Sequence, residues 1–250
     1  MNLRLFGVLA TVAMVASAPG NGEERSRVDQ LLDAWEKARV EVKDLTACFV
    51  RTQQTQLMRK PLVSKGTLVW SSHGFRWRSE EPEPSDMVIM GRTIEIYYPE
   101  LKTLERYRLR ERDMILTALP GLSTSVRELR DNYEISVEGE GSDERRQADS
   151  NQQPNKGDAA EAASTEENPS FVVFKLLPKP KRLRNYIRSI RIWADDQHFL
   201  PNRVEYVEWE GDVITIELSE IKRNVGIGPD SFKLDLPRDV EIVEPLEDLE

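Results

Sequence analysis

The sequence predicts a mainly β (α+β) protein, built as one antiparallel sheet of about 10 to 12 strands that curls on itself. Two observations predict this class. From residue 45 onward large apolar residues alternate with polar ones, as Phe75 and Trp77 do with Arg76 and Arg78. The turn segments between these runs are also too short for the crossovers that parallel strands need. One N-terminal helix and a few short helices complete the expected architecture.

The N-terminal helix is predicted over residues 26–42, with Ser26 as its N-cap and Asp29 in its first turn. Apolar residues then recur at spacings of three and four, and this places them on one stripe. The stripe consists of Val28, Leu31, Leu32, Trp35, Ala38 and Val42. Such a helix must pack this stripe on another element.

Helical material interrupts the strand pattern again between residues 110 and 131. Its first part contains the apolar residues Met114, Leu116 and Leu119 and ends at Pro120-Gly121. A second short helix is predicted near residues 126–129, with either Ser123 or Ser125 as its N-cap. Both pieces are short, so neither can cover a wide sheet.

Residues 138–169 contain no Val, Ile, Leu, Met or aromatic residue, and they hold nine acidic residues against three basic ones. Such a segment cannot bury enough apolar area to offset the entropy of ordering it. We therefore predict a disordered insertion within a hairpin. Strands are expected to resume over residues 171–177, 186–193, 204–209 and 213–221, with two short runs over 232–236 and 240–243.

Residues 1–18 have the pattern of a secretory signal peptide, with Arg4, an apolar run and then Ala16 and Ala18 around a cleavage site near Ala18. A membrane anchor would need about 18 apolar residues, whereas this run has about ten to twelve. We expect an exported chain in which residues 24–250 form a single domain that the segment 138–169 interrupts.

Composition excludes several function classes. The formal net charge is −9, which argues against nucleic-acid binding because a phosphate-binding face must be basic. Cys48 is the single cysteine, so no intramolecular disulfide can form.

The basic run at residues 178–184 is either a docking patch or a charged edge strand.

Catalytic and metal chemistry find no support in the residue pattern. His73 and His198 have no cysteine or carboxylate at metal-ligand spacing that would favour a metal site. No nucleophile elbow, phosphate loop or dinucleotide fingerprint occurs. We expect no enzyme activity, no metal and no cofactor; a hydrolase that uses some of the many carboxylates is the alternative without a specific signal.

A curled sheet of this width has more concave surface than the predicted helices can cover, which favours a hydrophobic cavity. Phe75 and Trp77 are the first candidates to line it. The alternative is that both residues belong to an ordinary filled core. Exposed cations at Arg76 and Arg78 on the opposite face favour the cavity. The full set of expected lining residues is Leu68, Trp70, Phe75, Trp77, Ile89, Ile94 and Ile96.

The order of motifs resembles the LolA family of outer-membrane lipoprotein carriers. In the first half the likeness rests on Gly66-Thr67-Leu68-Val69-Trp70, Phe75-Arg76-Trp77, Glu81-Pro82 and Gly91-x-x-Ile94-x-Ile96-Tyr97-x-Pro99. In the second half it rests on a Leu-Pro turn, a Glu-Gly hairpin, a turn at Asn224 and a terminal Phe-x-x-x-x-Pro. The resemblance covers most of the chain except residues 138–169.

The resemblance implies an unclosed β-barrel with a helical lid that holds lipoprotein acyl chains. Such a monomeric periplasmic carrier receives them from an inner-membrane ABC transporter and passes them to an outer-membrane acceptor. Phe75 and Trp77 would face acyl chains or lid, and Met114, Leu116 and Leu119 would lie on the lid. The family's basic residue before a proline is missing from the turn at residues 71–74. A LolA-like sensor of envelope stress, which binds lipid or a partner protein, is the alternative.

Overall fold

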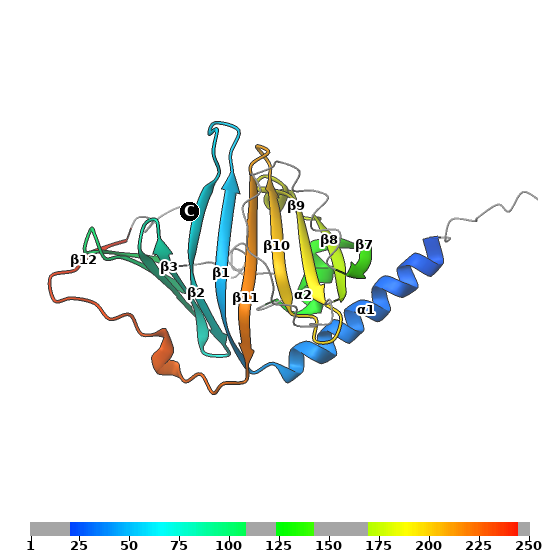
Figure 1. Cartoon of the computed structure of the whole chain (residues 1–250), viewed down its shortest axis with the longest axis horizontal. Coiled ribbons are helices and arrows are strands. Elements are labelled where there is room, and N and C mark those ends of the chain that lie inside the picture. Colours follow the sequence, from blue (N-terminus) through cyan, green and yellow to red (C-terminus); the bar gives the residue numbers. More distant parts are fainter. Residues whose placement is uncertain (1–20, 109–123, 143–169, 245–250) are drawn as a thin grey trace, which may run out of the picture.

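The computed structural model describes residues 21–108, 124–142 and 170–244, which form one strongly curved sheet that does not close (Figure 1). The first half contains α1 (Asn21–Glu41), β1 (Asp44–Gln54), β2 (Leu62–Ser71), β3 (Gly74–Glu81), β4 (Ser85–Met90), β5 (Thr93–Tyr98) and β6 (Thr103–Arg108). The second half contains α2 (Val126–Asn132), β7 (Tyr133–Ser142), β8 (Ser170–Pro178), α3 (Lys181–Arg184), β9 (Ile187–Asp195), β10 (Pro201–Glu208), β11 (Val213–Arg223), the 3₁₀ turn η3 (Pro229–Phe232) and β12 (Glu241–Val243).

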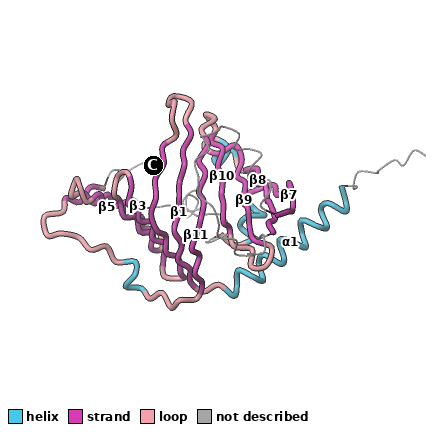
Figure 2. The backbone as a smooth tube through the Cα atoms, viewed as in Figure 1, coloured by secondary structure: helices cyan, strands magenta, loops and turns pink. Residues whose placement is uncertain are grey.

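The described strands are ordered β12-β6-β5-β4-β3-β2-β1-β11-β10-β9-β8-β7 in a 12-stranded sheet. This confirms the predicted curved sheet, and β1 and β11 join its two halves at the centre (Figure 2). One pairing differs from the expected antiparallel pattern, because β12 runs parallel to β6. The chain from residue 224 to residue 240 is long enough to cross the sheet and arrive in that direction. The strand predicted over residues 232–236 was wrong, since Phe232 ends the turn η3 instead.

The helix α1 packs its apolar stripe on the concave face of the second half of the sheet. Leu32 and Trp35 are 2% and 1% exposed, and the Trp35 ring lies 4.7 Å from that of Phe174 on β8. The described helix begins at Asn21, so Ser26 lies inside it and is not its N-cap. Glu23, Glu24 and Arg25 before Ser26 are good helix formers, and the helix extends through them and through Gly22.

Contacts at the end of α1 fix how the helix enters the sheet. The Asn224 side chain accepts a hydrogen bond from the Lys43 N–H at 2.8 Å and donates one to the Glu41 carbonyl at 3.0 Å. The buried carboxylate of Asp44 accepts hydrogen bonds from three successive N–H groups, those of residues 225–227. The turn after β11 therefore caps the junction between α1 and β1.

The short helix α2 begins as one of the two predicted caps requires. Ser125 is the N-cap, and it forms a capping box with Glu128. The N–H of Val126 donates to the Glu36 carboxylate of α1 at 3.0 Å, and this contact ties the two helices together. Val126 and Leu129 are buried against the core.

The C-terminal segment covers the outer, convex face of β3 to β6. Phe232 is fully buried against β3, and Val88 and Leu104 beneath this segment are each 1% exposed. Arg76 also lies on this face, where it pairs with Asp86 at 2.6 Å and donates to the Ser231 carbonyl at 2.8 Å. The expectation that Arg76 is exposed was therefore wrong, because its side chain is only 14% exposed. Arg78, at 50%, is exposed as expected.

Two further boundaries differ from the expectations. The strand β7 continues over residues 138–142, within the range expected to be a disordered insertion, because it pairs with β8 there. Glu138 also pairs with Lys175 at 2.6 Å and with Arg191 at 2.8 Å, which stabilises this polar stretch of strand. Residues 143–169 lie outside the described residues. The basic run at residues 178–184 ends β8 and forms α3 between neighbouring strands, so it is not an edge strand.

Candidate functional site

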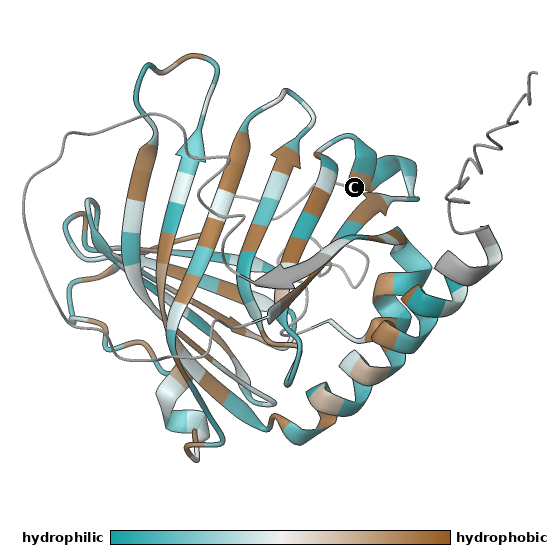
Figure 3. Ribbon diagram, turned by 45° about the vertical axis from the view of Figure 1, so that its right-hand side comes forward, coloured by the Kyte–Doolittle hydropathy of each residue, from teal (hydrophilic) through white to brown (hydrophobic). Residues whose placement is uncertain are grey.

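The register of the first five strands places all seven predicted cavity residues on one face of the sheet. Leu68 lies opposite Trp77, Trp70 lies opposite Phe75, and this row continues through Ile89 and Ile94. Ile96 shares that face, since it lies two residues from Ile94 on β5. Hydrophobic and hydrophilic residues alternate along the strands (Figure 3), as a sheet with two different faces requires. The expected common face therefore exists.

The cavity on this face has a volume of about 620 Å³, which is within the usual range for small-molecule binding pockets. Three of the seven predicted residues line it directly, namely Phe75, Trp77 and Ile96. The other four pack below or beside it: Leu68 and Ile94 are buried at 0% and 8% exposure, and Trp70 and Ile89 are partly buried.

The opposite wall of the cavity comes from the second half of the sheet, which the sequence-based prediction missed. It is formed by Tyr186, Ile187, Tyr206, Glu208, Ile214 and Ile216. Alternation over residues 204–209 and 213–221 would have placed Tyr206, Ile214 and Ile216 on a common face. Alternation alone does not show that the sheet bends enough for this face to lie opposite Phe75 and Trp77.

Trp77 is the largest side chain in the cavity wall. Its ring stacks on Phe49 of β1 with 3.7 Å between centroids, and the tilted ring of Phe75 lies 6.2 Å away. Phe49 itself is 1% exposed, whereas Trp77 is only partly buried. The stack therefore holds one face of the indole in place and leaves the remainder available to the cavity.

Polarity in the cavity changes along the strands. Inward residues of β3 run from Phe75 and Trp77 to Ser79, and the adjacent strand β4 begins opposite with Ser85 before Met87. On the other strands the polar residues Arg51, Ser64, Tyr98 and Glu208 lie toward this same end. The hairpin that joins β1 to β2 rises there (Figure 1). The wall from the first half of the sheet is thus apolar at one end and polar at the other, whereas Ile187 and Ile214 of the opposite wall also lie at the polar end.

Arg51 and Glu208 are the charged residues among the described lining residues. Arg51 Nη2 donates to Gln53 Oε1 at 2.8 Å, and no ion pair between Arg51 and a described carboxylate occurs. Burial lowers the pKa of Arg51, and the nearby charge of Glu208 opposes that change. Burial also raises the pKa values of Tyr98 and Tyr206, so both phenols stay neutral at physiological pH.

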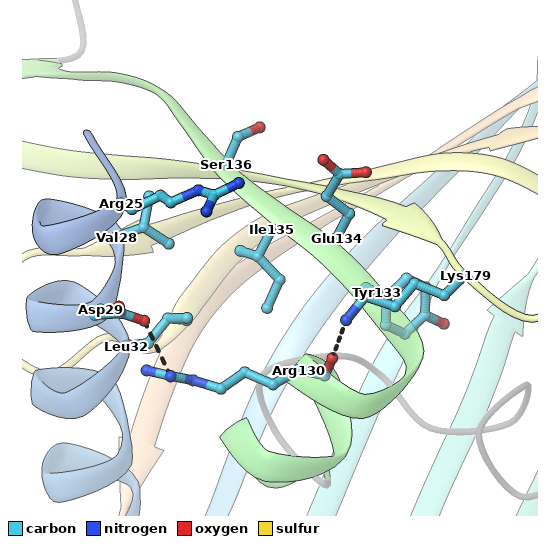
Figure 4. Close-up of a pocket in the computed structure, with 10 residues that line it drawn as sticks. All are labelled: Arg25, Val28, Asp29, Leu32, Arg130, Tyr133, Glu134, Ile135, Ser136 and Lys179. Atoms are coloured by element: carbon cyan, nitrogen blue, oxygen red, sulfur yellow. Dashed lines mark hydrogen bonds and ion pairs between the residues drawn. The ribbon is translucent and has the colours of Figure 1, made fainter. Parts of the chain in front are cut away.

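A second cavity of about 450 Å³ lies between α1, α2 and β7 (Figure 4). Three of its charged residues already have polar partners: Arg130 pairs with Asp29 at 3.0 Å, and Lys179 Nζ donates to the Arg130 backbone carbonyl at 2.6 Å. Val28, Leu32 and Ile135 supply its apolar part. With polar contacts already made within it, this cavity suits an apolar ligand less well than the first one.

Neither histidine lies in a metal-binding arrangement. Across the described ranges 21–108, 124–142 and 170–244, no group of three or more His, Cys, Asp or Glu side chains could hold a metal ion. His198 is 3.4 Å from Asp195, whose carboxylate accepts N–H groups of its own turn. In the part of the chain that the structure describes, no helix has the length and apolar character needed to span a bilayer.

The predicted lid residues Met114, Leu116 and Leu119 lie outside the described residues. Helical cover of the concave face that the structure does describe comes from α1 and α2, and both lie over the second half of the sheet. The turn at residues 71–74 joins β2 to β3 without a basic residue.

No model of a protein family matches the sequence. The outer-membrane lipoprotein carrier protein of Azotobacter vinelandii is 31% identical over 140 residues, which cover 54% of this chain and 63% of that protein. The chain therefore matches less than two thirds of this relative's length.

Two solved structures are similar to this chain at low sequence identity. An uncharacterized conserved protein from Thermus thermophilus is similar with a TM-score of 0.50 and 14% identity, over 87% of this chain and 99% of that one. A LolA superfamily protein from Nitrosomonas europaea is similar with a TM-score of 0.40 and 10% identity, over 83% and 97%. The chain is thus similar to a lipoprotein carrier over part of its sequence, and its motif order and open curved sheet agree with that similarity.

Proposed function

We propose that this protein is a periplasmic carrier that holds the acyl chains of lipoproteins in the cavity between the two halves of its sheet. The observation that carries the proposal is the cavity of about 620 Å³ whose walls include Phe75, Trp77 and Ile214. Each buried methylene contributes about 0.8 kcal/mol, so an acyl chain cannot cross water without such a receptacle.

The likeness to a lipoprotein carrier supports the direction of transport, from the inner to the outer membrane. In this proposal an inner-membrane ABC transporter loads the cavity and an outer-membrane acceptor empties it. The carrier acts as a monomer after its signal peptide is removed near Ala18, and it catalyses no reaction. An open sheet suits release, because ligand exit then needs no disruption of a closed barrel.

The test is binding of a fluorescent fatty-acid probe and of a triacylated lipopeptide to the purified mature protein. The Trp77→Glu variant should lose at least about tenfold in affinity, because it places a charge where apolar surface must be buried. The matched control is Trp193→Glu. Trp193 lies on the outer face of β9, where its ring contacts Arg203 at 4.6 Å, so this variant should bind normally.

Circular dichroism checks that both variants keep their strand content. If the folded wild type binds neither probe, the carrier proposal fails. If Trp77→Glu binds as well as Trp193→Glu does, the cavity wall has been assigned wrongly. A wild type that binds lipopeptide but never releases it to acceptor vesicles would favour the sensor alternative.

A further inference from the structure

Arg51 occupies an unusual position for a cation. It points into the cavity from β1, with Ser64 of β2 opposite on one side and Ile216 of β11 opposite on the other. It is partly buried, and its hydrogen-bond partner among the described residues is the neutral amide of Gln53. Removing a guanidinium from water without an anionic partner is unfavourable.

Three arginines on the outer face, in contrast, have carboxylate partners. On the outer face, Arg76 pairs with Asp86 at 2.6 Å, Arg106 with Glu95 at 2.9 Å and Arg191 with Glu205 at 2.8 Å. The fold thus supplies carboxylates to these outward cations, whereas the inward Arg51 makes no ion pair with a described residue. The charge of Glu208 acts on Arg51 without an ion pair or hydrogen bond between them. What Arg51 lacks is an anionic oxygen within hydrogen-bond distance, which a ligand can provide.

The change of polarity along the wall from the first half of the sheet gives such a ligand an orientation. Arg51 lies at the polar end with Ser64, Ser79 and Ser85, while Phe75 and Trp77 lie farther along the same face. A molecule with one charged end and one long apolar end matches this order. The opposite orientation would place the charge against the aromatic rings and leave Arg51 against methylene groups.

We propose that Arg51 binds the acidic head group of an acyl lipid, a carboxylate or a phosphate, and that the acyl chain extends from there toward Phe75 and Trp77. This inference rests on the proposed function, since it requires that the cavity hold acyl chains. It adds a second class of ligand, because the triacylated anchor of a lipoprotein carries no carboxylate or phosphate. Acidic acyl lipids would bind in one direction, with the head group at Arg51. Glu208 at the same end weakens the attraction for an anion, which favours release.

The experiment compares three ligands with the same chain length, namely laurate, dodecyl phosphate and dodecanol. Binding to the full mature protein is measured by displacement of the fluorescent fatty-acid probe at about pH 8, where carboxylic acids are ionised. The wild type should bind both anions at least about tenfold more tightly than the alcohol. Comparing laurate with dodecyl phosphate then shows which acid the site prefers.

Three variants test the role of Arg51. Arg51→Met should remove the preference for both anions while it changes dodecanol affinity less than about threefold. Lys65→Met is the matched control, because Lys65 is exposed on β2 and points to the opposite face from its neighbour Ser64. It should leave all affinities unchanged. Glu208→Gln should tighten anion binding severalfold, because it removes a nearby like charge.

The outcomes separate this inference from the proposed function. If the wild type binds none of the ligands, the carrier function fails. If it binds all three equally, or if Arg51→Met weakens anions and alcohol by the same factor, only the role of Arg51 is overturned. Should Arg51→Met not fold, as judged by circular dichroism, Glu208→Gln still decides the matter, since unchanged anion affinity in that variant contradicts the inference.

Discussion

The two halves of the sheet are covered from opposite sides. In the second half, α1 and α2 lie on the concave face, where Trp35 packs against Phe174. In the first half the cover lies on the convex face, where the C-terminal segment buries Phe232 against β3. The convex face of the second half instead carries paired charges such as Glu138 and Arg191. This difference leaves the concave face of the first half to the cavity.

Two tryptophans show what the difference means for single residues. Trp35 and Trp77 each contact a phenylalanine, at 4.7 and 3.7 Å between ring centroids. Trp35 is 1% exposed between helix and sheet, whereas Trp77 keeps accessible surface toward the cavity. Similar aromatic contacts therefore serve stability in one half and leave a surface available for binding in the other.

The largest expected effect on stability is at Trp35, in the half of the sheet that the helices cover. Trp35→Ala should lower the free energy of unfolding by about 3–5 kcal/mol, because it opens a cavity in the covered half. Trp77→Ala should cost less than half as much, since part of its surface is already accessible. Urea denaturation of both variants checks this, and equal losses would mean that the two halves are packed alike.

A smaller effect is expected from the convex side of the first half. Asp86 is 13% exposed and binds both Arg76 and Arg78. Asp86→Asn should destabilise the protein by about 2 kcal/mol, because charge-assisted hydrogen bonds to two guanidinium groups become neutral ones. The measurement is again urea denaturation. A change below about 0.5 kcal/mol would show that the C-terminal segment covers this face without help from the pair.

The smallest expected effect concerns the contact that joins α1 to α2. The Arg39 guanidinium lowers the pKa of Glu36, and the Val126 N–H contributes to this shift while burial opposes it. A lowered pKa stabilises the folded state above the unfolded pKa of about 4.3, and this stabilisation is lost as the pH falls through the folded value.

Glu36→Gln should therefore cost less than about 1 kcal/mol near pH 7, because Glu36 is 39% exposed and solvent screens its charge. The difference from wild type should shrink as the pH falls below about 4. Thermal unfolding followed across this pH range measures it. If the stability difference between Glu36→Gln and wild type stays constant with pH, the contact of Glu36 stabilises the protein through its hydrogen bonds and not through its charge.

Local patterns in the chain were sufficient for much of the fold. Alternation of apolar residues predicted most strands, the three-and-four spacing predicted the α1 stripe, and Ser125 with Glu128 formed one of the two caps considered. These local patterns failed where segments distant in sequence decide the structure. The pattern predicts that Arg76 is exposed, but the C-terminal segment covers its side chain. The parallel pairing of β12 depends on the path of a long connection.

The sequence by itself determined which side chains share a face, because residues two apart on a strand must point the same way. This is why Phe75 could be grouped with Trp77, and Ile94 with Ile96, from alternation within each strand alone. Only the tertiary structure decided that the face of β9 to β11 opposes them and that Arg51 lies between the two walls. Curvature sums small twists over many strands, and no short stretch of sequence contains that sum.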